Sequence, residues 1–348
     1  MYSSYSSLQQ SQLAAQGYYD TQSTYLLVYA PGRNTALRAT LADQLHRKFR
    51  LADTLGSALT EGVDGVLLVS EDVECMSTAL MCFAKALQDG ADYAVCNAVF
   101  GFGGATALYQ SRAHLAQNRC ALVSRPLLER CRAAAKDPEN VTELLALAAQ
   151  FCAHPARIPQ ALLHYERDIC AEDAFSATGK RAFLMSHVLD MTGAPIVLVS
   201  AVPVLRSMGY EVVVLGPSDG GALQLFVDAG AAVITRPGIR ATPNLWGLAL
   251  CTDLVLVNTV VMARTVRALS GTAVPVLWWL HDAFAGYPHI AHQIPTKLAG
   301  NVRLYSVGHH AANAMHAVRP DFQIGQLIYG LPDYAAEDFP RCDLGYPA

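Results

Sequence analysis

The stretch RAFLMSHVLDMTGAPIVLVSAVPVLRSMGYEVVVLGP, residues 181–217, decides the fold of the second half of the chain. It opens with an apolar run at residues 182–186, passes through a loop of small residues into a helical pattern at residues 194–208, and ends in a second apolar run at residues 211–215. Both runs have the length and composition of buried strands. The order strand, helix, strand predicts a parallel pair.

The same alternation continues through the rest of the second half. Further strands are expected at residues 232–235, 254–258, 274–280, 303–307 and 326–329, and further helices at residues 222–229, 261–269 and 309–318. Such alternation is typical of a parallel sheet covered by helices on both faces. We therefore expect residues 181–333 to form a doubly wound, Rossmann-like α/β domain that binds its ligand at the carboxyl ends of the strands.

The first half has a less regular α/β pattern. Strands are expected at residues 25–29, 65–70 and 91–98, and helices at residues 36–49, 52–59, 76–87, 125–136 and 141–153. Small and polar residues in AEDAFSATGK, residues 171–180, are typical of a linker. The sequence thus predicts a smaller, irregular α/β domain at residues 24–170, with tails at residues 1–23 and 334–348.

Composition narrows the class of protein. The net charge is −4 and no run of basic residues is present, which disfavours nucleic acid as a partner. No segment approaches the roughly 18 apolar residues of a membrane span. The N-terminus lacks the pattern of a signal peptide, and the nine cysteines contain no CxxC, so we expect reduced thiols. These features favour a cytoplasmic protein, with a peripheral position at the inner membrane face as one option.

The loop after the first strand of the second half is a candidate phosphate site. Thr192 can cap the helix that follows, and Gly193 allows a ligand to approach the backbone there and at Ala194. The N-terminus of a helix attracts anions such as phosphate. An ordinary cap and turn is the alternative interpretation.

Other strand ends carry polar or small residues. His281 and Asp282 follow the apolar run VLWWL, and an adjacent carboxylate can orient an imidazole for catalysis. A structural role for this histidine is an equally open alternative. Three more strand ends offer candidate substrate-binding residues: Gly220, Asn258 and Ser306. Several such loops along one edge of a sheet suit a ligand with phosphate and sugar parts.

With these landmarks in order, the second half resembles the N-terminal domain of family 4 glycosyltransferases of the GT-B class. The resemblance rests on SHVLDMTGAPIVLVSAVPVLRSMGYEVVVLGPSDG, NTVV, VLWWLHDA, YSVGHH and LIYGLPD, which together span residues 180–333. It implies that two Rossmann-like domains close over a nucleotide-sugar donor and a glycan acceptor, that Gly193 and His281 line this cleft, and that no metal is needed. The sequence continues only briefly past Asp333, where the donor-binding domain would begin. We therefore expect a fragment, a partner chain that supplies this domain, or a protein that is no longer catalytic.

The first half bears a fainter resemblance to family 2 glycosyltransferases of the GT-A fold. GVDGVLLVSEDVECMSTAL places Asp72 at the expected carboxylate, with Glu71 beside it, and IPQALLHYERD places His164 at the histidine that can complete the site. The resemblance implies a reduced GT-A-like domain with Mg²⁺ or Mn²⁺ as the cofactor, since carboxylate oxygens suit these ions. A solvated acidic turn is the alternative.

The leading hypothesis is a glycosyltransferase, or a truncated portion of one, that transfers a sugar to a glycan acceptor in cell-surface polysaccharide synthesis. The alternative is a non-catalytic acceptor-binding or scaffold subunit that partners a complete transferase. A nicotinamide-dependent dehydrogenase is disfavoured, because no GxGxxG follows residues 182–186 and no acidic residue ends the strand at residues 211–215.

Overall fold

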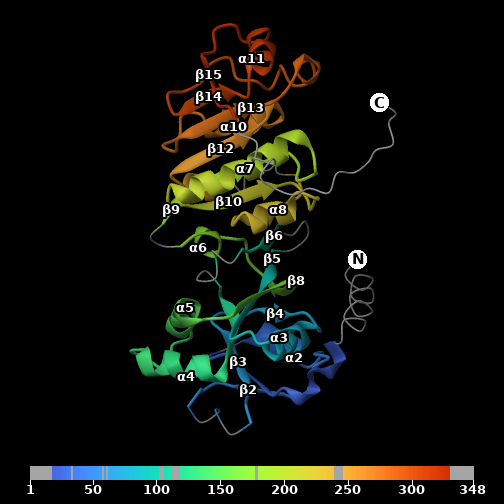
Figure 1. The fold of residues 1–348 in the computed structure, drawn as a ribbon, viewed down its shortest axis with the longest axis vertical. Coiled ribbons are helices and arrows are strands. Elements are labelled where there is room, and N and C mark those ends of the chain that lie inside the picture. Colours follow the sequence, from blue (N-terminus) through green and yellow to red (C-terminus); the bar gives the residue numbers. More distant parts are fainter. Residues whose placement is uncertain are drawn as a thin grey trace, which may run out of the picture.

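The structure, a computed structural model, describes residues 18–329 apart from gaps at residues 33, 57–58, 60–61, 102–105, 112–113, 115–117, 177–178 and 239–245. Figure 1 shows an elongated α/β molecule in which the first half of the chain, in blue and green, lies below the second half, in yellow to red. The predicted α/β class is confirmed in both halves. No helix in the described part of the chain has both the length and the apolar character needed to cross a membrane.

The first half is organised around β1 (Leu26–Tyr29), which lies between the parallel strands β2 (Phe49–Ala52) and β3 (Gly65–Val69). The antiparallel strand β7 (Cys120–Ser124) then joins β3 to β5 (Tyr93–Phe100). The remaining elements are β4 (Glu74–Cys75), β6 (Thr106–Tyr109), β8 (Pro155–Tyr165), a 3-10 helix (Tyr18–Ser23), α2 (Thr35–Leu41), α3 (Ala79–Gln88), α4 (Arg125–Ala134), α5 (Val141–Phe151) and α6 (Ala171–Ala174).

The second half is a parallel sheet in the order β15-β14-β13-β12-β9-β10-β11. Its strands are β9 (Lys180–Met185), β10 (Tyr210–Gly216), β11 (Ala232–Thr235), β12 (Leu254–Asn258), β13 (Val276–Leu280), β14 (Val302–Ser306) and β15 (Ile324–Gln326). The helices between them are α7 (Gly193–Ser207), α8 (Leu223–Asp228), α9 (Trp246–Leu250), α10 (Ala263–Leu269) and α11 (His309–His316), with short 3-10 turns at Val260–Met262 and Phe284–Gly286. This is the doubly wound, Rossmann-like sheet predicted from the sequence.

Alternating side chains of the central strand β9 pack on the two faces of this sheet. Ala182 and Leu184 pack with the apolar faces of α7 and α8, whereas Phe183 and Met185 pack with α10 and α11. The two-residue period of a strand therefore supplies both cores at once. Because both faces are covered, the strands read as continuous apolar runs, which is why their positions could be predicted.

One sheet passes through both halves of the molecule. Strand β11 pairs in antiparallel register with β6 of the first half, so that Val233 lies opposite Tyr109. Figure 1 shows β6 and β5 reaching up to the second half at this junction. The largest group of buried apolar residues also contains side chains from both halves. The predicted boundaries of two domains stay a prediction, but the halves share backbone hydrogen bonds and a core.

The sequence-based assignment was wrong in parts of the first half. Residues 49–52, expected in or beside helices, form the edge strand β2, and the strands β6, β7 and β8 were not predicted at all. Within the expected linker at residues 171–180, α6 forms and Phe175 is buried. Residues 1–17 of the first tail and the whole of the tail at residues 334–348 lie outside the described residues. The eight described cysteines are free thiols, as predicted.

Candidate active site at the switch point of the sheet

The winding of the second sheet reverses between β9 and β12. The chain moves from β9 to β10 and β11 on one side, then crosses to β12, β13, β14 and β15 on the other. The loops after β9 and β12 therefore leave the sheet in opposite directions, and ligands of open α/β sheets bind at the carboxyl end of such a point. Five residues brought together here are called the switch-point site below: His187, Gly193, Asn258, Thr259 and His281.

The first turn of α7 faces this edge with unused backbone donors. Thr192 is its N-cap residue, yet its side chain makes no capping hydrogen bond, which corrects the role expected from the sequence. A Cβ atom built on Gly193 would meet nothing within 4 Å, so packing does not require glycine there. An uncapped helix N-terminus with open space before it can bind an anion at Gly193 and Ala194.

Asn258 ties the end of β12 to this turn. Its Nδ2 donates to the Ala194 carbonyl at 3.0 Å, and the residue is fully buried. The side-chain oxygen Oδ1 is buried without a hydrogen-bond partner. A buried amide oxygen without a partner costs free energy, and such groups often mark a functional site.

Thr259 has an unusual backbone conformation. With φ 71° and ψ 162°, it is the one non-glycine residue of the described chain at positive φ. This region is almost restricted to glycine, and a β-branched residue occupies it only when its surroundings enforce it. Here the Thr259 N–H donates to the Trp279 carbonyl at 2.8 Å, and Trp278 Nε1 donates to the Thr259 carbonyl at 2.8 Å. Two consecutive residues of β13 thus hold Thr259 in place.

His281, a predicted catalytic residue, lies beside another histidine. Its ring packs against Trp279 with the centroids 4.8 Å apart, and its Nε2 is buried without a partner. Burial, and secondarily the nearby His187, lowers the pKa of His281 to about 4, so the ring is neutral at pH 7. His187 in turn places Nδ1 3.4 Å from the Thr259 hydroxyl. Two imidazoles and one hydroxyl therefore meet at the switch point.

Asp282 has a different partner from the one expected. Its carboxylate accepts the N–H of Val260 at 2.6 Å and so stabilises the turn that leads from β12 into the following helix. Burial raises the pKa of Asp282 above its usual value. Burial and the Asp282 charge both raise the pKa of Tyr287, whose hydroxyl is buried without a hydrogen-bond partner. Asp282 therefore holds the backbone at Thr259 and Val260 in place. The side chain that helps to lower the pKa of the His281 ring is His187.

Gly220 and Ser306, also expected to bind substrate, have other surroundings. A Cβ atom on Gly220 would lie 2.3 Å from the Leu189 carbonyl oxygen, so this glycine lets two loops of the strand-end edge touch. Ser306 is fully buried, and its hydroxyl has no partner. It lies opposite Leu280 on the neighbouring strand and faces the core under α10 and α11, away from α7.

The three predicted metal ligands lie in the first half and are engaged separately. Asp72 accepts the N–H groups of Ala36 and Leu37 at 3.1 Å each, at the start of α2. Glu71 pairs with Arg167 at 2.6 Å. No group of three histidine, cysteine or acidic side chains in the described residues has the geometry of a metal site. The residues present do not fit a cation as they stand, and the Mg²⁺ or Mn²⁺ site stays a prediction.

His164 is the third of these residues. Its Nδ1 lies 2.6 Å from Glu74 Oε2, and its Nε2 lies 2.9 Å from the Gly101 carbonyl. Burial alone would lower the pKa of His164, but these two acceptors raise it above the ordinary value. His164 thus joins β4 to β8 and the turn after β5.

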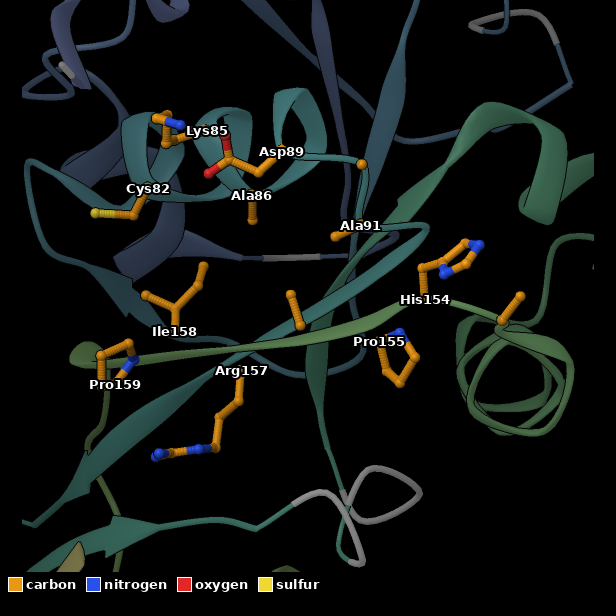
Figure 2. A pocket seen from close by; sticks show the side chains of 13 residues that line it. Cys82, Lys85, Ala86, Asp89, Ala91, His154, Pro155, Arg157, Ile158 and Pro159 are labelled. Atoms are coloured by element: carbon orange, nitrogen blue, oxygen red, sulfur yellow. Dashed lines mark hydrogen bonds and ion pairs between the residues drawn. The ribbon is translucent and has the colours of Figure 1, made fainter. Parts of the chain in front are cut away.

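A cavity of about 450 Å³ with a mixed polar and apolar lining opens elsewhere in the first half (Figure 2). Lys85 of α3 and Asp89, the residue after this helix, form an ion pair on one wall, and His154 and Pro155 lie on another, where β8 begins. Arg157 points to the opposite side of β8 from Ile158 in Figure 2. The cavity therefore lies at the amino end of β8, away from the strand ends that carry polar side chains in the second half.

Comparison with known families assigns the second half. Residues 178–313 match the sequence model of glycosyl-transferase family 4. This segment is therefore similar to family 4 glycosyltransferases. It contains every residue of the switch-point site, and the resemblance inferred from the sequence motifs is confirmed there. The match does not extend to residues 24–170, whose likeness to family 2 stays a prediction. Comparison with curated proteins found no similar sequence.

Sequence reasoning named three of the five residues of the switch-point site, Gly193, Asn258 and His281, and missed the other two, His187 and Thr259. His187 stands two residues after the last residue of β9, at the start of the loop that leads to Gly193. Its position just past a buried strand resembles that of His281, and this was the available signal. Thr259 gave no signal, because a positive φ at threonine cannot be read from residue type.

Proposed function

We propose that this chain acts as a glycosyltransferase, or as part of one, and transfers a sugar from a nucleotide-sugar donor to a glycan acceptor in cell-surface polysaccharide synthesis at the cytoplasmic side of the membrane. The observation that carries the proposal is the meeting of an uncapped helix N-terminus with two imidazoles at the switch point of a domain similar to family 4 glycosyltransferases. These are the groups that a phosphate and a sugar hydroxyl require.

The proposed chemistry divides between two parts of the site. Sugar transfer breaks the bond between the sugar and the β-phosphate and releases a nucleoside diphosphate, and the backbone N–H groups at Gly193 and Ala194 would stabilise its charge. The acceptor hydroxyl loses a proton in the same reaction. His281 is neutral at pH 7, which leaves a ring nitrogen able to accept a hydrogen bond from this hydroxyl, while its lowered pKa makes it a weak base and leaves the released proton to water. No step of this proposal uses a metal ion.

The alternative is a non-catalytic subunit that binds an acceptor glycan and partners a second chain with a donor domain. Unpartnered Asn258 Oδ1 and His281 Nε2 would serve glycan binding without any reaction. The two functions differ in one measurable property. A transferase, alone or with its partner chain, binds nucleotide sugar at the switch-point site, whereas a scaffold binds the acceptor glycan alone.

Isothermal titration of the full chain with UDP, GDP and their glucose and mannose conjugates tests the proposal. We expect at least one nucleotide sugar to bind, and His281→Ala to weaken that binding by about tenfold, as the loss of one good hydrogen bond predicts. His289→Ala is the matched control, because His289 is exposed on the loop after β13. If no nucleotide or conjugate binds even at millimolar concentration, the transferase proposal fails for this chain and the scaffold alternative replaces it.

A further inference from the structure

Thr259 is the strained residue of the switch-point site, and glycine would remove the strain. Besides the Cβ atom that causes the strain, threonine has two groups that glycine lacks, a methyl group and a hydroxyl. The residue is buried, and the hydroxyl oxygen lies 3.4 Å from Nδ1 of His187. That contact crosses the switch point and joins the end of β12 to the loop after β9.

The surroundings of Thr259 are built to hold this conformation. Trp279 accepts its N–H and Trp278 donates to its carbonyl, while Asp282 accepts the N–H of the next residue, Val260. On the other side Asn258 is fixed to the first turn of α7. Strain of this kind persists only where several contacts enforce it, and it concentrates at sites where geometry matters for function.

We propose that Thr259 is a positioning residue: its strained backbone keeps its hydroxyl against Nδ1 of His187, so that the His187 and His281 rings together present hydrogen-bonding atoms to a hydroxyl group of a sugar. The inference deepens the proposed function and rests on it for the identity of the ligand. Its geometric part stands alone. A hydrogen bond at Nδ1 selects which nitrogen of His187 carries the proton, and therefore whether Nε2 donates or accepts.

Nitrogen NMR of the full chain with ¹⁵N-labelled histidine tests the geometric part without a ligand. Thr259→Val keeps the shape of the side chain and removes the hydroxyl, and Thr259→Ser keeps the hydroxyl. We expect the valine variant to change the ratio of the two His187 tautomers and the serine variant to preserve it. His316, whose Nε2 contacts the Phe322 carbonyl at 3.0 Å, is the internal reference. Unchanged His187 nitrogen shifts in Thr259→Val would overturn the proposal.

The strain is tested by comparing Thr259→Gly with Thr259→Ala. Glycine is normally the less stable of the two, because it has more freedom in the unfolded chain. At a position with φ 71° the order reverses, so we expect the glycine variant to have the larger folding equilibrium constant, by about tenfold. An alanine variant that is as stable as the glycine variant would show that Thr259 is not strained.

Titrations with UDP, UDP-glucose and methyl glucoside locate the sugar contact. We expect Thr259→Val to weaken the binding of UDP-glucose or methyl glucoside by about tenfold and to leave the binding of UDP unchanged. Thr259→Ser should bind all three ligands as the parent does. Equal weakening of UDP would assign Thr259 to the nucleotide and overturn this part of the proposal. If the parent chain binds none of these three and none of the GDP ligands either, the proposed function fails, and the NMR and stability comparisons still decide the positioning role.

Discussion

Asp72 shows how one residue type serves two different purposes. The sequence places it in an acidic turn after a buried strand, where a carboxylate is expected to bind a cation. In the structure its two oxygens accept the N–H groups of Ala36 and Leu37, and so cap α2 from a distant part of the chain. Four N–H groups at the start of any helix lack partners within it, so a carboxylate is stabilised there without a metal.

Replacement of Asp72 separates these roles. We expect Asp72→Ala to reduce the free energy of unfolding by about 1 kcal/mol through loss of the cap, and Asp72→Asn to lose less. Urea denaturation without Mn²⁺ measures the loss of stability in each variant, and denaturation with Mn²⁺ measures any stabilisation by the metal. The metal hypothesis would gain support instead if Mn²⁺ stabilised the parent protein and failed to stabilise Asp72→Asn.

Two glycines at the strand-end edge of the second sheet make a matched pair. A Cβ atom on Gly220 would lie 2.3 Å from the Leu189 carbonyl oxygen, whereas a Cβ atom on Gly193 would meet open space. We expect Gly220→Ala to lower stability by about 1–3 kcal/mol and Gly193→Ala to leave it within about 0.5 kcal/mol. Nucleotide binding should weaken in Gly193→Ala. Thermal denaturation and titration with UDP measure the two effects, and a normal affinity in Gly193→Ala would remove this glycine from the site.

At the scale of elements, α7 connects packing with function. Its buried side chains, Leu198, Val202 and Leu205, fix the helix on the sheet, and this places its first turn beside Asn258. Pro203 lies inside the helix and is exposed. A proline there has no N–H to donate to the carbonyl one turn earlier, so the helix lacks one backbone hydrogen bond on its solvent side.

Pro203→Ala should restore that bond. We expect the free energy of unfolding to rise by about 1–3 kcal/mol, the range set by helix propensity and the recovered hydrogen bond. The midpoint of urea unfolding measures the change. Ser200→Ala, at an exposed position of the same helix, is the control and should change stability by a few tenths of a kcal/mol. A loss of stability in Pro203→Ala would mean that α7 is bent at this residue and packs only in that form.

The elements that could be predicted share one property. All seven strands of the second half are parallel, and most are buried on both faces, so each produces an apolar run between helices. The first half mixes parallel and antiparallel strands. Strand β2 is an edge strand with half-buried side chains, and β8 mixes buried, half-buried and exposed residues irregularly over eleven positions. Neither gives a continuous apolar run, and FRLA at β2 follows directly on a helical pattern.

The candidate site, like the fold, could be predicted from the sequence only in part. Gly193, Asn258 and His281 follow predicted strands and could be named from their positions. The neutral state of His281 depends on burial and on His187, and the role of Asp282 depends on the N–H of Val260. These are contacts between loops far apart in the sequence, and residue type alone does not specify them.

At the scale of the whole molecule, His114 lies where the two halves meet. It is buried, its Nδ1 lies 2.8 Å from the Ser111 hydroxyl, and that hydroxyl donates to the Gly230 carbonyl of the second half at 3.1 Å. Burial, with a smaller effect of the Arg206 charge, lowers the pKa of His114 to about 4. The folded protein therefore keeps this ring neutral, whereas the unfolded chain protonates it near its ordinary pKa of about 6.5.

The resulting stability depends on pH in a definite direction. Between about pH 6.5 and pH 4 the unfolded state binds more protons at His114, so acidification destabilises the fold, and the contribution is complete above pH 6.5. We expect a loss of about 2 kcal/mol between pH 7 and pH 4.5 that His114→Asn reduces, since asparagine does not titrate. Urea unfolding across this range measures it. Parallel pH profiles for the parent and the variant would exclude His114 as the source.

The pairing of β6 with β11 also constrains the order in which a newly synthesised chain can fold. When the ribosome has released the first half, β6 has β5 on one side and no partner on the other until β11 emerges. An open strand edge of this kind can join a second nascent chain. Conversely, a gene piece encoding only residues 178–313 would release β11 with the same open edge. The segment at residues 178–313 therefore relies on β6 of the first half to cover the edge of β11, and we expect it to self-associate when it is produced alone.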